Sequence, residues 1–186
     1  MARPWSAAWR SKNSVSAHSS PPPTSPFNAS RDYRFNAPSA EFGVLYAAMR
    51  AEGAFIETFG RVLEAKAPLT TRRQLEMRAL SALTFATPLR LVDLTGAGLA
   101  GLGIDKRIST TEDSPLAQRW ARWFWSHPEA VHGLFYCSRH DPGEACVALF
   151  AGRSAPSTSA IANPLSTPGF AAELARLLDR YGAAVL

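Results

Sequence analysis

The chain has 186 residues, of which 46% are hydrophobic and 19% are charged. This length and composition suit one domain with a buried core, and they exclude a chain that is disordered throughout. No apolar run reaches the roughly 18 residues that a membrane span needs, and the first residues lack the apolar region of a secretory signal. The net charge of +5 favours an anionic partner, but the basic residues are too scattered to identify one.

Cysteine and histidine are the residues that would indicate disulfides or a metal. Cys137 and Cys146 are too few for a disulfide framework, and no CxxC pair accompanies them. We expect both to be reduced, structural residues of a cytoplasmic protein. His127, His132 and His140 lack a second ligand at helical spacing, so no metal site is predicted.

Residues 1–30 differ in composition from the rest of the chain. They contain a triple proline at 21–23 and many serines, and no acidic residue precedes Asp32. A triple proline favours extended polyproline II backbone. We expect a basic, proline- and serine-rich N-terminal arm over 1–30, partly disordered or loosely docked with an edge strand near Trp9, followed by one domain over 31–186. A mitochondrial transit peptide has a similar composition and is the less favoured interpretation.

Hydrophobic periodicity and turn residues predict the elements of the domain. In chain order they are a strand at 44–48, a helix at 51–65, a strand at 89–94, a glycine-rich turn at 96–103, a helix at 114–126, antiparallel strands at 134–137 and 146–150, a polar loop at 152–167 and a last helix at 167–182. The strands and helices mix without regular βαβ alternation, which is typical of the α+β class.

The glycine-rich turn has a GxGxxG spacing at Gly96, Gly98 and Gly101. A dinucleotide fingerprint needs this turn to open a long helix, with an acidic residue about 20 positions later. Here Gly103 follows and no apolar helical period begins. We therefore interpret the segment as a flexible turn and not as part of a Rossmann fold.

The helix at 114–126 is rich in aromatic residues. Leu116, Trp120, Trp123 and Phe124 keep helical spacing, which predicts that they face the core. Only Trp125 is left over for a membrane or partner surface.

Glu57 has an unusual environment on the helix predicted at 51–65. Gly53 at i−4 and Gly60 at i+3 lie on the same helix face as Glu57. Each glycine costs about 1 kcal/mol relative to alanine inside a helix, so some gain should offset the two. The space beside the carboxylate would serve a ligand or the close approach of another backbone. An exposed glutamate on a loosely packed helix explains the pattern equally well.

Three segments, in this order and spacing, resemble the RES domain, a family named for an arginine, a glutamate and a serine. Residues 33–38 (YRFNAP) resemble its arginine-aromatic-Asn/Asp/His segment, which a proline or glycine follows. Residues 42–48 (FGVLYAA) resemble its Gly-Val-x-Tyr-x-Ala strand, with Glu57 eleven residues after the tyrosine. Residues 133–141 (GLFYCSRHD) resemble its Gly-x-x-Tyr-x-Ser-Arg segment, which an apolar strand follows.

The resemblance covers roughly residues 31–151, because 105–121 also resemble the middle of the family's domain. Where the family often has glycine before its arginine, this chain has Tyr33.

The resemblance implies an ADP-ribosyltransferase-like split β-structure with flanking helices, and NAD⁺ in a central cleft. It implies a toxin that is neutralised by a cognate antitoxin, which usually carries a helix-turn-helix domain. Members attack NAD⁺ by hydrolysis or phosphorolysis, or pass ADP-ribose to a protein. NAD⁺ is then a substrate, so no cofactor is expected, and neither membrane nor direct nucleic-acid binding is expected.

The chemistry of NAD⁺ cleavage suggests a role for each residue of the resemblance. Cleaving the nicotinamide–ribose bond develops oxocarbenium character, which a carboxylate such as Glu57 would stabilise. Arg34 would clamp the pyrophosphate or the adjoining ribose. Tyr46 would offer a flat face to nicotinamide or its hydroxyl to the ribose. Ser138 would bind the nicotinamide ribose or orient Glu57.

Arg139 and Arg107 are further candidates for phosphate contact.

Two other functions remain open at this point. A protein mono-ADP-ribosyltransferase would use the same pocket and add a surface for an acceptor protein. A non-enzymatic basic binding module is the more remote alternative. Taken singly, Arg34 could also be a salt-bridge partner of Asp32, Tyr46 a core tyrosine and Ser138 a strand-end serine.

Overall fold

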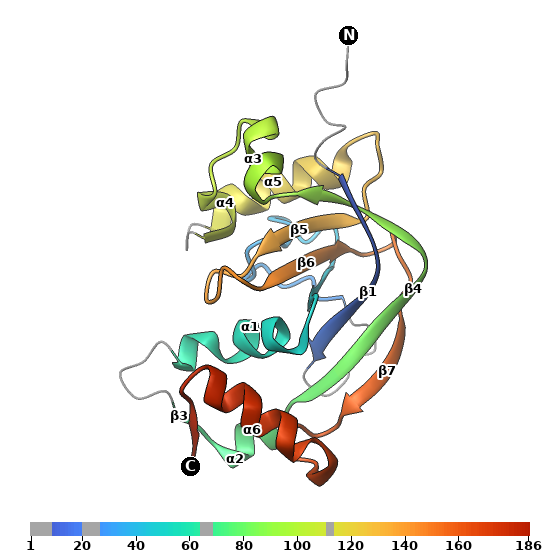
Figure 1. Ribbon diagram of the computed structural model, residues 1–186. Coiled ribbons are helices and arrows are strands. Elements are labelled where there is room, and N and C mark those ends of the chain that lie inside the picture. The colour runs from blue at the N-terminus through green and yellow to red at the C-terminus, as the bar shows by residue number, and fades with distance from the viewer. Residues whose placement is uncertain (1–8, 20–26, 64–68, 111–113) are drawn as a thin grey trace.

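The structure is a computed structural model that describes residues 9–19, 27–63, 69–110 and 114–186 (Figure 1). Within these residues one curled, six-stranded sheet has the strand order β1-β2-β6-β5-β4-β7. The strands of this sheet are β1 Trp9–Ser19, β2 Val44–Ala48, β4 Ala79–Asp93, β5 Gly133–Cys137, β6 Ala145–Phe150 and β7 Ser157–Ala162. A separate parallel pair joins β3 Leu69–Thr70 to β8 Ala184–Val185.

The long strand β4 divides the sheet into two parts. Its first half, from Leu80 to Thr84, lies between β1 and β7, and its second half pairs with β1 and with β5. Ser16 of β1 lies opposite Ala82 of β4 and also opposite Ala48 of β2, so the sheet curls until β1 pairs with both β2 and β4. The α+β class and a split, curled β-structure with flanking helices are confirmed.

The two faces of the sheet bury two separate cores. Alternate residues of β2, β5 and β6, including Leu45, Phe135 and Val147, pack with Leu89 and Leu91 of β4 on the inside of the curl. Because successive side chains of a strand point to opposite faces, residues such as Ala48, Tyr136 and Ala148 lie on the other face of the sheet. Helices cover this second face.

The helices form two groups at the two ends of the sheet (Figure 1). One group holds α3 Gly96–Leu102, α4 Arg107–Thr110 and α5 Ser114–Ser126. The other holds α1 Ala51–Leu63, α2 Arg72–Glu76 and α6 Ala171–Arg180, and a 3-10 turn at Pro168–Phe170 leads into α6. No helix in the described ranges is long and apolar enough to cross a membrane.

Most predicted elements are confirmed, and three are corrected. The strand predicted at 89–94 begins ten residues earlier, at Ala79, and β1 and β7 flank this additional half. The loop predicted at 152–167 contains strand β7, whose small, mostly exposed residues carry no apolar alternation. The glycine-rich turn is the short helix α3, in which Gly98 allows close approach, since a Cβ there would lie 2.2 Å from the carbonyl oxygen of Asp93.

The aromatic assignment within α5 is also corrected. Phe124 is buried as expected, whereas Trp123 is 39% exposed. Trp125, which was expected to be left over, stacks on Phe42 with ring centroids 4.9 Å apart. The helix therefore turns a slightly different face to the core than the simple spacing predicted.

Candidate active site

Ser138 and Glu57 are joined by a hydrogen bond across the helix-covered face of the sheet. Ser138 follows β5, and its Oγ donates to Oε1 of Glu57 on α1 at 2.5 Å. The same Oγ accepts the backbone N–H groups of His140 at 3.2 Å and Asp141 at 3.3 Å. Because these two donors occupy the acceptor side of the hydroxyl, its own proton is directed to the carboxylate.

The two residues differ in their access to solvent. Ser138 is 1% exposed, whereas Glu57 is an exposed residue. The structure therefore brings them together in the arrangement in which the serine orients the glutamate. A ligand would meet the carboxylate and not the buried hydroxyl.

The glycines beside Glu57 make this hydrogen bond possible by letting α1 approach its neighbours. A Cβ on Gly60 would lie 2.4 Å from Cγ of His140, and a Cβ on Gly53 would lie 2.8 Å from Cβ of Ala48. The space that the sequence left open is thus filled by protein side chains. The hairpin turn that holds Ser138 lies directly against the helix face of Glu57.

Arg34 lies on a turn-rich segment, residues 31–36 (the arginine loop), which α4 and α5 hold. Its Nη1 donates to the backbone carbonyl of Ser109 on α4. The buried amide of Gln118 on α5 donates to the carbonyls of Arg31, at 2.7 Å, and Tyr33, at 3.1 Å. These contacts fix the arginine loop against α4 and α5.

Tyr46 holds the other end of the arginine loop. Its hydroxyl accepts the N–H of Phe35 at 2.9 Å and donates to Oδ1 of Asn36 at 2.9 Å. Asn36 is fully buried and donates in turn to the backbone carbonyls of Asn28 and Ser30. The Tyr46 hydroxyl is therefore engaged within the protein and ties the arginine loop to β2.

Tyr33 adds a second aromatic ring at this place. It is 49% exposed, and its ring centroid lies 5.8 Å from that of Tyr46 at a tilt of 41°. Tyr33, which occupies the position where the RES domain often has glycine, thus lies at the surface beside Tyr46.

The charges of the site act on one another. Burial lowers the pKa of the Arg34 guanidinium, while the nearby Tyr136 and Glu57 act in the opposite direction. Burial likewise raises the pKa of Tyr46 and of Tyr136, and the negative charge of Glu57 contributes to both increases. Arg34, Tyr46 and Glu57 are therefore close enough to interact electrostatically, and both tyrosines are neutral at pH 7.

The two secondary arginines lie in different places. Arg139 interacts electrostatically with Arg34, and its Nε donates to Nε2 of His140 at 3.3 Å. Arg107 shares the short helix α4 with Ser109, but its side chain is 75% exposed and pairs with Asp105 at 3.4 Å. The structure thus brings Arg139 to the site and leaves Arg107 at its edge.

Several residues that build the site were not singled out from the sequence. Asn36 and Gln118 anchor the arginine loop, and Asp141 and Glu144 shape the turn after Ser138. A polar residue between apolar ones, such as Asn36 between Phe35 and Ala37, was the available signal. Within the described ranges, no three His, Cys, Asp or Glu residues are placed to hold a metal ion.

Comparisons with a family model and with solved structures each found a match. The family model described as "RES domain" matches residues 5–172. Among solved structures, the chain is similar to a chain of the M. tuberculosis MbcT-MbcA toxin–antitoxin complex, with 17% identity, a TM-score of 0.58, and coverage of 88% of this chain and 91% of the other. No match was found among the curated proteins. The family model spans the arginine loop, the glutamate helix and the serine turn together, and the chain therefore belongs to the RES-domain family.

Proposed function

We propose that this protein cleaves the nicotinamide–ribose bond of NAD⁺ and acts as a toxin that a cognate antitoxin neutralises. The observation that carries the proposal is the 2.5 Å hydrogen bond from Ser138 to Glu57. It holds an exposed carboxylate in one orientation beside a half-buried arginine. Membership of the RES-domain family supports the same conclusion.

The reaction suits a single oriented carboxylate. As the bond between the nicotinamide nitrogen and ribose C1′ breaks, its electron pair leaves with nicotinamide, which becomes neutral and needs no general acid. Positive charge develops on the ribose, and Glu57 stabilises it electrostatically. An oxygen of water or phosphate then bonds to C1′; water would release its proton to the carboxylate or to solvent.

Arg34 and the tyrosines would bind the rest of the substrate. One N–H of Arg34 bonds to the carbonyl of Ser109, and a guanidinium has five N–H donors. The others suit a pyrophosphate, which guanidinium binds in bidentate geometry. The rings of Tyr33 and Tyr46 suit the flat nicotinamide ring.

The toxin role rests on fold and family. The similar solved structure is a toxin–antitoxin complex, and it shares the fold of this chain at low sequence identity. By resemblance we propose an antitoxin partner that carries a helix-turn-helix domain. The net charge of +5 favours an acidic antitoxin surface.

The deciding experiment measures NAD⁺ loss by the purified protein, with and without phosphate. We expect the wild type to consume NAD⁺ and Glu57→Gln to be slower by about 10²- to 10³-fold, because an electrostatic contact to the transition state is lost. Glu76→Gln, which changes an exposed glutamate on α2, is the matched control and should keep full activity. Equal rates for Glu57→Gln and the wild type would refute the assignment of Glu57.

The products identify the acceptor. ADP-ribose indicates hydrolysis, and a phosphorylated ADP-ribose that forms only with phosphate indicates phosphorolysis. If neither forms, labelled NAD⁺ in a cell lysate tests transfer to protein, since a discrete labelled band appears only for a protein ADP-ribosyltransferase. The absence of both NAD⁺ loss and a labelled band would refute the proposed reaction.

A further inference from the structure

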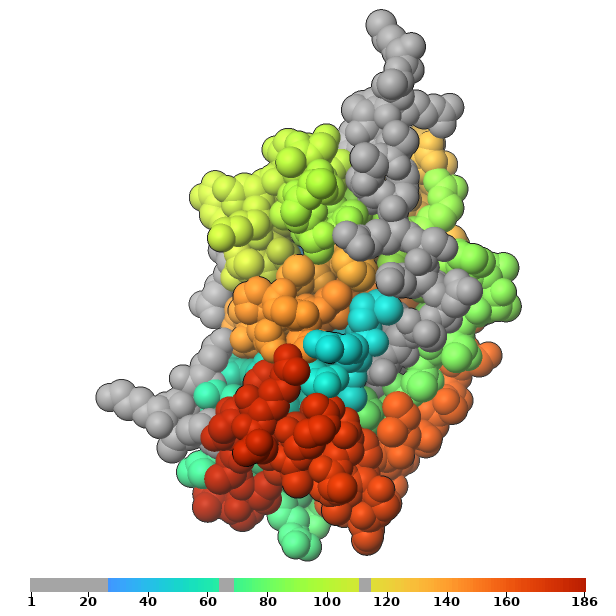
Figure 2. All heavy atoms as spheres, in the orientation of Figure 1, coloured from blue at the N-terminus to red at the C-terminus, as the bar shows by residue number. Residues whose placement is uncertain are grey.

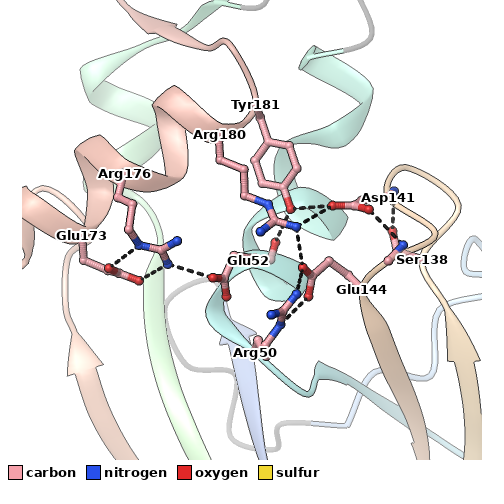
Figure 3. Close-up of polar contacts among 10 residues, drawn as sticks. Arg50, Glu52, Ser138, Asp141, Glu144, Glu173, Arg176, Arg180 and Tyr181 are labelled. Atoms are coloured by element: carbon pink, nitrogen blue, oxygen red, sulfur yellow. Dashed lines mark hydrogen bonds and ion pairs between the residues drawn. The ribbon is translucent and has the colours of Figure 1, made fainter.

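The C-terminal helix α6 contacts the turn that carries Ser138 (Figure 3). Nη2 of Arg180 donates to Oδ2 of Asp141 at 3.2 Å and to Oε1 of Glu144 at 2.9 Å. The hydroxyl of Tyr181 donates to the same Oδ2 at 3.1 Å. In the space-filling view the red C-terminal segment lies against the orange β5–β6 turn (Figure 2).

These contacts act on the part of the turn that orients Ser138. The N–H of Asp141 donates to Ser138 Oγ, and the carbonyl of Asp141 accepts the N–H of Glu144 at 2.9 Å. The carbonyl of Glu144 accepts the N–H of Ser138 at 2.8 Å, which closes the turn. A shift of Asp141 would therefore move the donors that direct the Ser138 proton to Glu57.

The charges at this place favour a fixed geometry. Burial alone would raise the pKa of Asp141, but the N–H of Gly143, the guanidinium of Arg180 and the hydroxyl of Tyr181 together hold it below its usual value. Burial and the neighbouring Asp141 raise the pKa of Tyr181 to about 12, so its hydroxyl remains a donor at pH 7. The carboxylate of Asp141 is thus ionised, and its Oδ2 accepts from both Arg180, the last residue of α6, and the next residue, Tyr181.

Glu144 shows that Arg180 is not needed merely to neutralise a buried charge. Its side chain is 1% exposed, and Arg50 contacts both of its carboxylate oxygens. If Arg180 is removed, Arg50 still neutralises Glu144. The chain should therefore fold without Arg180, and the loss should be concentrated at Asp141.

We propose that Arg180, assisted by Tyr181, is a positioning residue that acts through Asp141 on the Ser138–Glu57 pair. The proposal rests on the proposed function, in which Glu57 is the reacting carboxylate. Arg180 lies beyond residues 5–172, to which the family model matches.

The test compares variants of α6 in NAD⁺ turnover by the full-length protein. Arg180→Ala should lower kcat by about 10- to 100-fold, which is the range found when a residue that orients a metal-binding side chain is removed. KM should stay within about twofold of the wild-type value. Arg180→Lys should restore part of kcat. Tyr181→Phe should lower kcat less, because its ring keeps the stacking on Phe55, whose ring centroid lies 6.0 Å away.

Arg176→Ala is the matched control on the same helix. Arg176 pairs with Glu52 and Glu173 and makes no contact with the described atoms of the Ser138 turn, so kcat should be unchanged (Figure 3). Equal kcat losses in Arg176→Ala and Arg180→Ala would mean that α6 acts only by its general docking, and would overturn the proposal. A full kcat in Arg180→Ala would overturn it as well.

Amide hydrogen exchange tests the positioning independently of catalysis. The N–H groups of His140 and Asp141 should exchange at least about tenfold faster in Arg180→Ala than in the wild type, with no change in Arg176→Ala. Unchanged exchange would overturn the positioning role even if the variant were less active. If the wild type consumed no NAD⁺, the proposed function would fail, while the exchange result would still decide whether Arg180 holds the turn.

Discussion

At the scale of single residues, the arginine loop is held by hydrogen bonds to the backbone carbonyl of Ser109, the hydroxyl of Tyr46 and the side-chain amide of Gln118. Asp32, the partner that adjacency suggested for Arg34, accepts a hydrogen bond from Ser30 instead, and Arg34 donates to the carbonyl of Ser109, 75 residues away in the sequence. A backbone acceptor fixes the guanidinium without neutralising it. The positive charge of Arg34 therefore remains for an anionic ligand.

Replacing Arg34 with lysine should remove most of the activity although the charge is kept. Lysine has no planar fork for Ser109 and a phosphate together, and a lost hydrogen bond to a charged group costs about 1.5–3 kcal/mol. We expect kcat/KM for NAD⁺ to fall by about 10- to 100-fold, close to the value for Arg34→Ala. Arg72→Lys, at an exposed arginine of α2, is the control. A fully active Arg34→Lys would show that charge alone suffices.

Some contacts between side chains of the site could be predicted from the sequence, whereas contacts with the backbone could not. The order of Arg34, Tyr46, Glu57 and Ser138 was visible in the sequence, and orienting Glu57 was one of two roles left open for Ser138. The engagement of the Tyr46 hydroxyl was not predictable, because its partners are the backbone of Phe35 and a buried amide. Patterns of side chains do not show where backbone N–H groups will lie.

At the scale of elements, prediction succeeded where local periodicity decides the structure. Strand β2 occupies 44–48 as predicted, and helix α5 occupies 114–126 as predicted. Strand β7 and the first half of β4 were missed because their stability comes from pairing across the sheet, such as Thr84 with Ser157. Many residues of both segments are small and exposed, so the sequence there lacks the apolar alternation by which strands are predicted.

Helix α1 can lie close to its neighbours because Gly60 has no side chain, so adding one methyl group there should destabilise the protein. Gly60→Ala would gain about 1 kcal/mol in helix propensity, but its Cβ would lie 2.4 Å from Cγ of His140. Overpacking costs about 1–3 kcal/mol, so the free energy of unfolding should fall by up to about 2 kcal/mol. NAD⁺ turnover should fall too, since His140 and Ser138 move together.

The matched control for this substitution is Gly101→Ala on α3. A Cβ at Gly101 meets no atom within 4 Å, so this variant should gain about 0.5–1 kcal/mol in stability and keep full activity. Urea unfolding and NAD⁺ turnover measure both effects. A Gly60→Ala protein as stable and active as Gly101→Ala would show that the close approach of α1 is dispensable.

At the scale of the whole molecule, ion pairs link the C-terminal helix to the body. Arg176 joins Glu173 of α6 to Glu52 in the first turn of α1, and Arg180 joins α6 to the β5–β6 turn. Such links across the chain were not predictable, because opposite charges in a sequence with 20 basic and 15 acidic residues have many alternative partners. Because these ion pairs need ionised carboxylates, the packing of α6 on the body should depend on pH.

The stability gained from Arg176 should therefore disappear in acid. Hydrogen bonds from Arg176 lower the pKa of Glu173 below its usual value. For Glu52, burial acts to raise the pKa, but its own backbone N–H and Arg176 outweigh burial and lower it as well. A lowered folded-state pKa stabilises the protein above the unfolded value of about 4.5 and loses this effect as pH falls through the folded value. We expect Arg176→Ala to lower Tm by on the order of 1–3 °C at pH 7, and this difference from the wild type to shrink towards zero near pH 3. A difference that stays the same from pH 7 to pH 3 would mean that neither carboxylate contributes through its charge, and that Arg176 stabilises α6 by packing alone.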